Sequence, residues 1–280
     1  MLTDKTAPRL SVIIPAHNEA GMIDACLQAL FASEPVPGGA EVIVVANGCH
    51  DTTVAEAEAC RPQARDWTLS VLDMPQGGKP GALSAGEAVA RGAVLAYLDA
   101  DVLVSPPLLR QIAEALDRTG PGYASGQVVI PTPRNAFSRL YAGFYRRVPF
   151  FHHGVPGCGL FAMTRAGRSR WGDWPGIISD DTFARLHFAP RERHAVPAPY
   201  SWPIVEGFGA LIRVRRRQDA GVAEISRLYP ALLANDDARP RGPAWVLRAA
   251  LRVPLGFLAY IAVAIAVRLR QGGDDWARGR

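Results

Sequence analysis

The stretch that decides the fold is VLAYLDADVLV at residues 94–104, where an apolar run meets two carboxylates and a second apolar run follows. Apolar residues on both sides predict a strand buried on both faces, as in a mostly parallel sheet. Asp99 and Asp101 would then follow the carboxyl end of that strand, which is where open α/β sheets bind ligands. Two carboxylates there are costly unless something positive meets them, and the simplest partner is a divalent cation that carries a phosphate. The alternative is a polar turn, since Asp is a common turn residue.

The flanking sequence predicts strands and helices in alternation. Strands are expected at residues 10–15, 41–46, 68–72 and 94–98, with helices at about 20–32, 52–60, 81–91 and 106–118. Strand-plus-helix units of about 25 to 30 residues indicate right-handed βαβ crossovers and a mostly parallel α/β sheet. Beyond residue 118 the alternation becomes irregular, with strands expected at 123–130 and 160–163 and helices at about 135–151, 165–171 and 182–188.

The composition indicates an ordered globular protein, because 49% of the 280 residues are hydrophobic and 20% are charged. The formal net charge is +5, and basic residues concentrate after residue 130, with RVRRR at 213–217. Such a run suits nucleic acid, anionic lipid or a diphosphate, but the absence of helix-turn-helix or zinc-finger spacing argues against nucleic acid. The four cysteines form no CxxC pair and the N-terminus shows no signal pattern, so we expect a cytoplasmic protein with free thiols.

The C-terminal region contains VPLGFLAYIAVAIAV at 253–267, which is 15 residues without a charge. A membrane span needs roughly 20 apolar residues. Arg248 and Arg252 precede this run and Arg268 and Arg270 follow it. The pattern favours a helix lying in the membrane interface, with a spanning helix and a buried core helix as the alternatives.

Six short motifs occur in order along the chain. They are VIIPAHNE at 12–19, VVANGCHDTT at 44–53, GGKPGALSAG at 77–86, LDADV at 98–102, GCGLFAMTRAG at 157–167 and SDD at 179–181. Together they resemble the family 2 glycosyltransferases of the GT-A fold, over about residues 10–220. The resemblance implies a Rossmann-like, mostly parallel sheet flanked by helices, with a nucleotide-sugar half at about 10–130 and an acceptor half at about 131–220. We interpret residues 1–240 as one such domain, followed by a C-terminal apolar helix within 241–280 that is membrane-associated.

The resemblance also implies a set of donor-binding residues. Pro15, His17, Asn18 and Glu19 would cradle the base and ribose, Asn47 would face the base in place of the family's usual acidic residue, and Lys79 would lie near the diphosphate. Since an Asn amide can pair with more than one base edge, UDP-type and GDP-type donors both remain open. Each residue also has a structural interpretation: Glu19 with a helix dipole, Asn47 in an Asn-Gly turn, and Lys79 as a solvated side chain.

The two acidic pairs receive the chemical roles. By resemblance Asp101 is the direct ligand of Mg²⁺ or Mn²⁺, and Asp99 bonds the ribose or a metal-bound water. Asp181 would be the general base that takes the proton of the acceptor hydroxyl, with Asp180 orienting the acceptor. A single displacement of this kind inverts the anomeric centre. The alternative for this second pair is helix capping after Ser179.

The remaining site assignments are a pair of glycines and an arginine. By resemblance Gly157 and Gly159 would allow close approach of the sugar or acceptor. The run at 213–217 lacks the Gln-x-x-Arg-Trp motif of processive members, but one of Arg213, Arg216 or Arg217 would reach the diphosphate, and Arg216 is our choice. The alternative is a solvated or lipid-facing basic helix. The resemblance thus implies a metal-dependent inverting glycosyltransferase at the inner face of the cell membrane, with an acceptor hydroxyl for which a lipid-linked carrier is one candidate. A non-catalytic sugar-nucleotide-binding protein and a sugar nucleotidyltransferase are the rival functions.

Overall fold

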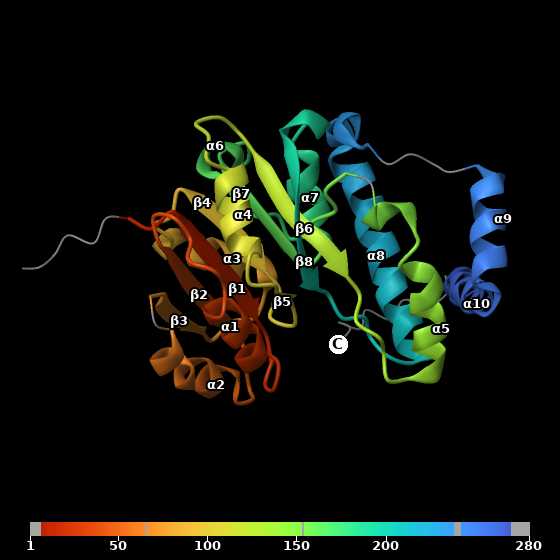
Figure 1. Ribbon diagram of the computed structural model, residues 1–280, viewed down its shortest axis with the longest axis horizontal. Helices are drawn as coiled ribbons and strands as arrows, with labels where there is room; N and C mark the ends of the chain where they lie inside the picture. Colours follow the sequence, from red (N-terminus) through yellow and green to blue (C-terminus); the bar gives the residue numbers. More distant parts are fainter. Residues whose placement is uncertain (1–6, 65, 153, 238–241, 270–280) are drawn as a thin grey trace, which may run out of the picture.

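A mixed sheet of eight strands runs through the computed structural model, which describes residues 7–64, 66–152, 154–237 and 242–269 (Figure 1). Within these residues the strand order is β3-β2-β1-β4-β7-β6-β8-β5. The strands are β1 Leu10–Ala16, β2 Ala40–Asn47, β3 Thr68–Met74, β4 Val94–Leu98, β5 Leu103–Val104, β6 Tyr123–Val129, β7 Leu160–Thr164 and β8 Arg193–Ser201. The expected α/β sheet is therefore confirmed.

The first four strands pair in parallel, in the register that places Ile13 opposite Ile43 on β2 and Tyr97 on β4. Strand β7 then inserts antiparallel between β4 and β6, and β8 runs parallel to β6. The patterns used above do not delimit β5 or β8. In β8 the apolar alternation is interrupted by Pro197 and Pro199, which ordinarily argue against a strand.

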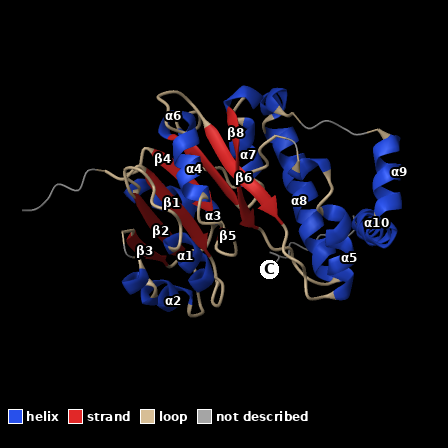
Figure 2. Ribbon diagram, in the orientation of Figure 1, coloured by secondary structure: helices blue, strands red, loops and turns tan. Residues whose placement is uncertain are grey.

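Helices cover both faces of the sheet (Figure 2). They are α1 Ile23–Phe31, α2 Thr53–Ala59, α3 Lys79–Val89, α4 Leu108–Ala115, α5 Ala136–Tyr145, α6 Arg165–Arg168, α7 Asp180–Leu186, α8 Phe208–Leu228, α9 Pro243–Arg252 and α10 Pro254–Leu269, with short 3₁₀ turns at Arg61–Gln63, Pro149–Phe151, Pro190–Glu192 and Pro230–Asn235. On β1, Val12 and Ile14 pack with α1 and α4, whereas Ile13 packs with α3. Alternation along the strand thus assigns each face its own core.

Gly86 brings α3 close to the sheet, because a Cβ atom there would lie 2.5 Å from Cγ2 of Ile13. At the amino ends of the strands, the buried carboxylate of Glu41 accepts from Ser11 Oγ at 2.6 Å and from the backbone N–H of Arg91 at 2.7 Å. Burial raises the pKa of Glu41, but these hydrogen bonds outweigh it and hold the pKa below its ordinary value. Glu41 therefore fixes the turn into β4 at the end of the sheet far from Asp99.

The C-terminal helix α10 packs one narrow face against α5 and α8. Gly256, Ala259, Val263 and Val267 are buried in this contact, and Tyr260 stacks on Tyr141 of α5 with 5.5 Å between ring centroids. Among the described residues, no single helix has both the length and the apolar composition to cross a membrane. Trp245–Arg252 and Pro254–Leu269, which are bent by 118° relative to each other, are long and apolar enough only when they are taken together.

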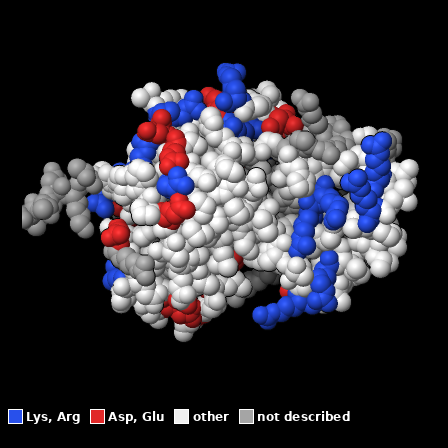
Figure 3. Space-filling model, viewed as in Figure 1, with Lys and Arg blue, Asp and Glu red and all other residues white. Residues whose placement is uncertain are grey.

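The other face of the C-terminal helix pair is apolar and exposed. Its leucines, which are 61% to 81% exposed, are Leu247, Leu251, Leu255, Leu258 and Leu269. Exposed arginines lie beside them, including Arg248, Arg252 and Arg268. Figure 3 shows basic side chains gathered over the region where α8 and α9 lie.

Candidate active site

A cavity of about 210 Å³ opens where the parallel strands end. Its charged lining comes from four elements: Lys79 on α3, Asp99 after β4, Asp180 and Asp181 on α7, and Arg217 on α8. Asp99 from the first acidic pair and both members of the second pair, which follows about 80 residues later in the sequence, therefore border one cavity. Asp101 is not among the described residues that line it.

Lys79 bridges the two acidic pairs. Its ammonium Nζ lies 2.9 Å from Oδ1 of Asp99 and 3.1 Å from Oδ2 of Asp180. Burial lowers the pKa of Lys79, but the charges of Asp180 and Asp99 outweigh it and raise the pKa above its ordinary value. The lysine thus stays charged and joins the two halves of the site.

Asp101 lies in a region of concentrated negative charge. Burial, followed by the charges of Asp99 and Glu19, raises the pKa of Asp101 to about 7, and Lys79 offsets this only in part. The backbone of Asp99 donates to the carbonyl of Gly159 at 2.8 Å, so the end of β4 is tied to the loop before β7. An added cation at this place would relieve the repulsion among the three carboxylates.

The residues fit a hard divalent cation. Carboxylate oxygens are the ligands that Mg²⁺ and Mn²⁺ prefer, and such ions commonly take one or two carboxylates and complete their shell with phosphate oxygens and water. Within the described ranges, no group of three or more His, Cys, Asp or Glu side chains is arranged to hold a metal by itself. Asp101, with Asp99 beside it, is therefore suited to a metal that arrives with a phosphate.

Asp181, on the first turn of α7, is partly buried and lines the cavity. Burial, followed by the charge of Asp180, raises the pKa of Asp181 to about 6, while Lys79 acts in the opposite direction. Its Oδ1 accepts from the backbone N–H of Thr182 at 2.7 Å. The N-cap residue Ser179 makes no side-chain capping bond within the described structure. Asp181 remains ionised at neutral pH and is a stronger base than an ordinary aspartate.

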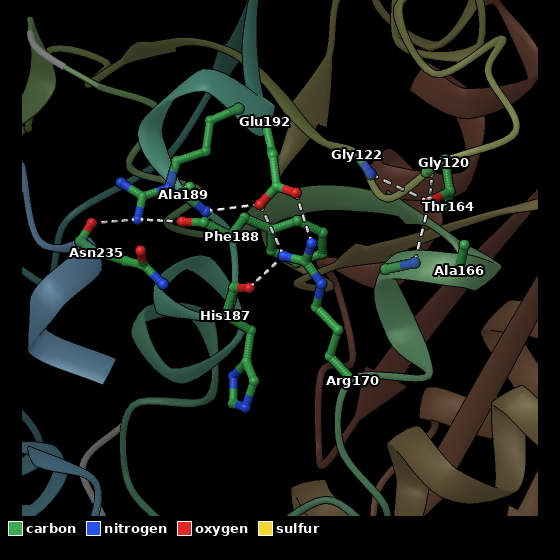
Figure 4. A network of polar contacts seen from close by, with 12 residues as sticks. Gly120, Gly122, Thr164, Ala166, Arg170, His187, Phe188, Ala189, Glu192 and Asn235 are labelled. Atoms are coloured by element: carbon green, nitrogen blue, oxygen red, sulfur yellow. Dashed lines mark hydrogen bonds and ion pairs between the residues drawn. The ribbon is translucent and has the colours of Figure 1, made fainter. Parts of the chain in front are cut away.

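The far end of α7 is held by buried arginines. Arg185 contacts Asp236 at 3.3 Å and Asp237 at 3.0 Å, and Arg193 donates to the carbonyls of Phe188 and Asn235. Figure 4 shows the adjoining network, in which the carboxylate of Glu192 meets Arg170 beside His187 and Phe188. These contacts make α7 a rigid support for its two aspartates.

Of the base-binding residues expected from the sequence, Pro15 lines this cavity, whereas His17, Asn18, Glu19 and Asn47 are not among its described lining residues. The ring Nδ1 of His17 lies 2.6 Å from the carbonyl of Asn47. The Asn47 side chain is buried; it donates to the carbonyl of Ala16 at 2.8 Å and accepts from the backbone N–H of Gly78 at 3.0 Å. Asn47 thus joins β1, β2 and the glycine-rich loop, and a role toward a base stays a prediction.

Gly157 and Gly159 have positive φ angles of 70° and 74°. A Cβ atom at Gly159 would lie 2.5 Å from Cδ1 of Trp202, and one at Gly157 would lie 1.9 Å from the hydroxyl of Tyr123. Both glycines are therefore required by backbone conformation and by neighbouring aromatic rings. Any closeness to a substrate remains a prediction.

Of the three arginines considered in the basic run, Arg217 is the one that lines the cavity among the described residues. Tyr97 and Phe161 also line it, and the motifs indicated neither of them. Tyr97 had a signal in the sequence, because it stands two residues before Asp99 on a strand and so shares its face. Phe161 had none, since its position depends on the antiparallel insertion of β7.

Comparison with known proteins identifies the family. The family model described as Glycosyl transferase family 2 matches residues 11–167. The chain belongs to the family 2 glycosyltransferases. It is 34% identical over 136 residues to the dolichyl-phosphate beta-glucosyltransferase of Drosophila melanogaster and 32% identical over 128 residues to glycosyltransferase AglE of Haloferax volcanii. Each match covers 46% of this chain and 42% of the relative, so the chain spans about two fifths of the length of these relatives.

Solved structures of glycosyltransferases share the fold. The mannosyltransferase PcManGT from Pyrobaculum calidifontis, in complex with GDP-Man and Mn²⁺, aligns with a TM-score of 0.62 at 22% identity, covering 96% of this chain and 89% of that one. Glucosyl-3-phosphoglycerate synthase of Mycobacterium tuberculosis aligns with a TM-score of 0.56 at 18% identity, covering 84% of each chain. At these identities the likeness shows the GT-A fold.

The raised pKa of Asp101 predicts a pH-dependent cost to stability. Because the folded-state pKa of about 7 lies above the ordinary value near 4, ionisation destabilises the metal-free protein as the pH rises through that interval. Asp101→Asn should therefore raise the free energy of unfolding by about 1 to 2 kcal/mol at pH 8 and leave it nearly unchanged at pH 4.

Thermal unfolding in a chelator, at both pH values, measures this difference. Asp117→Asn is the matched control, because the Asp117 side chain is 78% exposed. A variant at Asp101 that is no more stable than wild type at pH 8 would contradict the charge distribution described above.

Proposed function

We propose that the chain is a metal-dependent inverting glycosyltransferase that moves a sugar from a nucleoside-diphosphate sugar to an acceptor hydroxyl. The observation that carries this proposal is the ion bridge through Lys79, which brings Asp99 and Asp180 to one ammonium group. A donor-binding carboxylate pair and an acceptor-activating carboxylate pair are what a single displacement needs on opposite sides of the reacting carbon.

At the donor end, Asp101 would be the direct ligand of Mg²⁺ or Mn²⁺, with Asp99 bonding the ribose or a metal-bound water. When bound, the metal supplies electrostatic stabilisation to the leaving nucleoside diphosphate. Lys79 is placed to meet the diphosphate as a point charge. Structural neighbours hold GDP-Man with Mn²⁺, UDP with Mn²⁺, and UDP-GlcNAc, so the proposed donor is of the UDP or GDP type.

At the acceptor end, Asp181 would take the proton of the acceptor hydroxyl as its oxygen attacks the anomeric carbon. The carboxylate is partly buried, and its raised pKa of about 6 gives it more driving force for proton transfer than an exposed aspartate has. Asp180, held by Lys79, would orient the acceptor. One displacement on the face opposite the diphosphate inverts the configuration of the sugar.

Asp181→Asn separates this proposal from a sugar-nucleotide-binding protein without catalysis. An enzyme should lose turnover by about 10²-fold or more, because the base is removed, while nucleoside diphosphate still binds. Release of nucleoside diphosphate from UDP-glucose and GDP-mannose with Mn²⁺ measures turnover, and titration calorimetry measures binding. Asp173→Asn, on the loop before α7, is the control. Turnover at the wild-type rate in Asp181→Asn would contradict the role of Asp181 as the general base.

We further propose that α9 and α10 hold the enzyme at the cytoplasmic face of a membrane, with a lipid-linked acceptor. The exposed leucines of these helices offer an apolar face of the kind that enters a lipid interface, and the flanking arginines suit anionic headgroups. A relative is named for a dolichyl-phosphate substrate, which is a lipid phosphate, and that name agrees with this placement.

The double variant Leu251→Glu and Leu255→Glu tests this surface. Each leucine buried in lipid contributes about 1.5 to 3 kcal/mol, so the double variant should bind vesicles at least about 10-fold more weakly. Co-sedimentation of the full chain with vesicles of phosphatidylglycerol and phosphatidylcholine gives the measurement. Val222→Glu with Leu228→Glu, two exposed apolar positions on α8, is the control. Equal vesicle binding by the helix-pair variant and by wild type would contradict the proposed membrane contact.

A further inference from the structure

Glu87, near the C-terminal end of α3, is a junction of three side chains. Its Oε1 accepts from the hydroxyl of Tyr97 at 2.7 Å and from the indole N–H of Trp174 at 2.6 Å. Nε of Arg168 donates to both carboxylate oxygens, at 2.8 and 2.9 Å. The Glu87 side chain is only 15% exposed, and Tyr97 and Trp174 are buried.

Two of these partners lead directly to the site. Tyr97 stands two residues before Asp99 on β4, and Trp174 stands six residues before Asp180, on the loop that enters α7. The rings of Tyr97 and Trp174 meet edge to face, with 5.3 Å between centroids, and Trp171 contacts both Trp174 and Phe183 of α7. The Glu87 carboxylate therefore links the strand that carries Asp99 to the loop and helix that carry Asp180 and Asp181.

Helix α3 makes this link twice. At its first residue, Lys79 joins Asp99 to Asp180; eight residues later, Glu87 joins Tyr97 to Trp174. Eight residues of α-helix span about 12 Å. The contacts of Lys79 border the cavity, where a diphosphate would compete for the ammonium group. The Glu87 carboxylate instead borders a second pocket together with Arg168, and it is held by donors from three side chains.

We infer that Glu87 is a positioning residue for the transfer reaction, fixing the separation between Asp99 and Asp181 while Lys79 engages substrate. The inference rests on the proposed function for its catalytic consequence, but the mechanical link stands on the contacts alone. Misplacement by about 1 Å costs an enzyme up to 10²-fold in rate. A brace between the two carboxylate pairs, formed by the bonds of Glu87 to Tyr97 and Trp174, therefore has a direct chemical use.

Glu41 provides the matched comparison. It too is a buried carboxylate with several donors, yet it lies at the opposite end of the strands. Removing either carboxylate should lower stability, because both leave polar partners unpaired. Only removal of Glu87 should disturb the loop and helix that carry the catalytic aspartates.

The experiment compares Glu87→Ala, Glu87→Gln, Trp174→Phe and Glu41→Ala, each in the full chain. Hydrogen exchange of residues 171–186 reports the brace without any substrate. Release of nucleoside diphosphate from UDP-glucose and GDP-mannose with Mn²⁺ gives kcat and KM.

We expect Glu87→Ala to speed exchange in 171–186 and to lower kcat about 10-fold or more, with KM for the donor changed by less than about threefold. Glu87→Gln should recover part of kcat, since its amide oxygen still accepts from Tyr97 or Trp174. Trp174→Phe, which removes one bond and keeps a ring, should shift both readouts in the same direction by less. Glu41→Ala should lower the unfolding temperature and leave both readouts at wild-type values below it.

Unchanged exchange in 171–186 for Glu87→Ala and Trp174→Phe would overturn the inference, as would equal losses of kcat in Glu87→Ala and Glu41→Ala. Failure of wild type to release nucleoside diphosphate from either donor would count against the proposed function instead. The exchange measurement would still decide whether Glu87 holds the two elements together.

Discussion

The structure of the site depends on the balance between four neighbouring carboxylates and one ammonium group. Asp99, Asp101, Asp180 and Asp181 lie at one edge of the sheet, and Lys79 bridges one member of each pair. The raised pKa values of Asp101 and Asp181 show that this lysine does not neutralise the whole cluster. A site with unbalanced negative charge, hard oxygen ligands and a bridging ammonium group is suited to a divalent cation that arrives with a diphosphate.

The fold produces this concentration of charge through one topological feature. Strand β4 ends at Leu98, one residue before Asp99, and the antiparallel strand β7 beside it is preceded by Gly159, whose carbonyl accepts from the Asp99 backbone N–H. That pairing brings the second half of the chain against the first, so that the aspartates of α7 and Asp99 line the same cavity. Helix α3 then joins β4 and its following loop to α7 and the loop before it, through Lys79 at its first residue and Glu87 near its last turn.

The sequence predicted the alternation of strands and helices and the charged residues that line the cavity, because both follow from local patterns. Val94–Leu98 is the strand predicted from its apolar run, and the family predicted from six motifs is confirmed by the match over residues 11–167. Local patterns do not determine positions that depend on contacts with distant parts of the chain. Strand β8 was not delimited because it contains two prolines, and which arginine of the basic run lines the cavity depends on the rotation of α8. Glu87 gave no signal, since a glutamate on a helix is ordinarily a solvent-exposed residue. The division of the chain at about residue 240, like the roles of the individual site residues, stays a prediction.

The central claim is that the carboxylates beside β4 bind a nucleoside diphosphate through a divalent cation. The most direct test is titration calorimetry of UDP and GDP, with Mn²⁺ and with chelator, on wild type and on Asp101→Ala. The account predicts that one nucleotide binds wild type in a Mn²⁺-dependent manner and that Asp101→Ala weakens this binding by at least about 10-fold. Folded wild-type protein that binds neither nucleotide, or that binds one equally well in chelator and in Asp101→Ala, would contradict it.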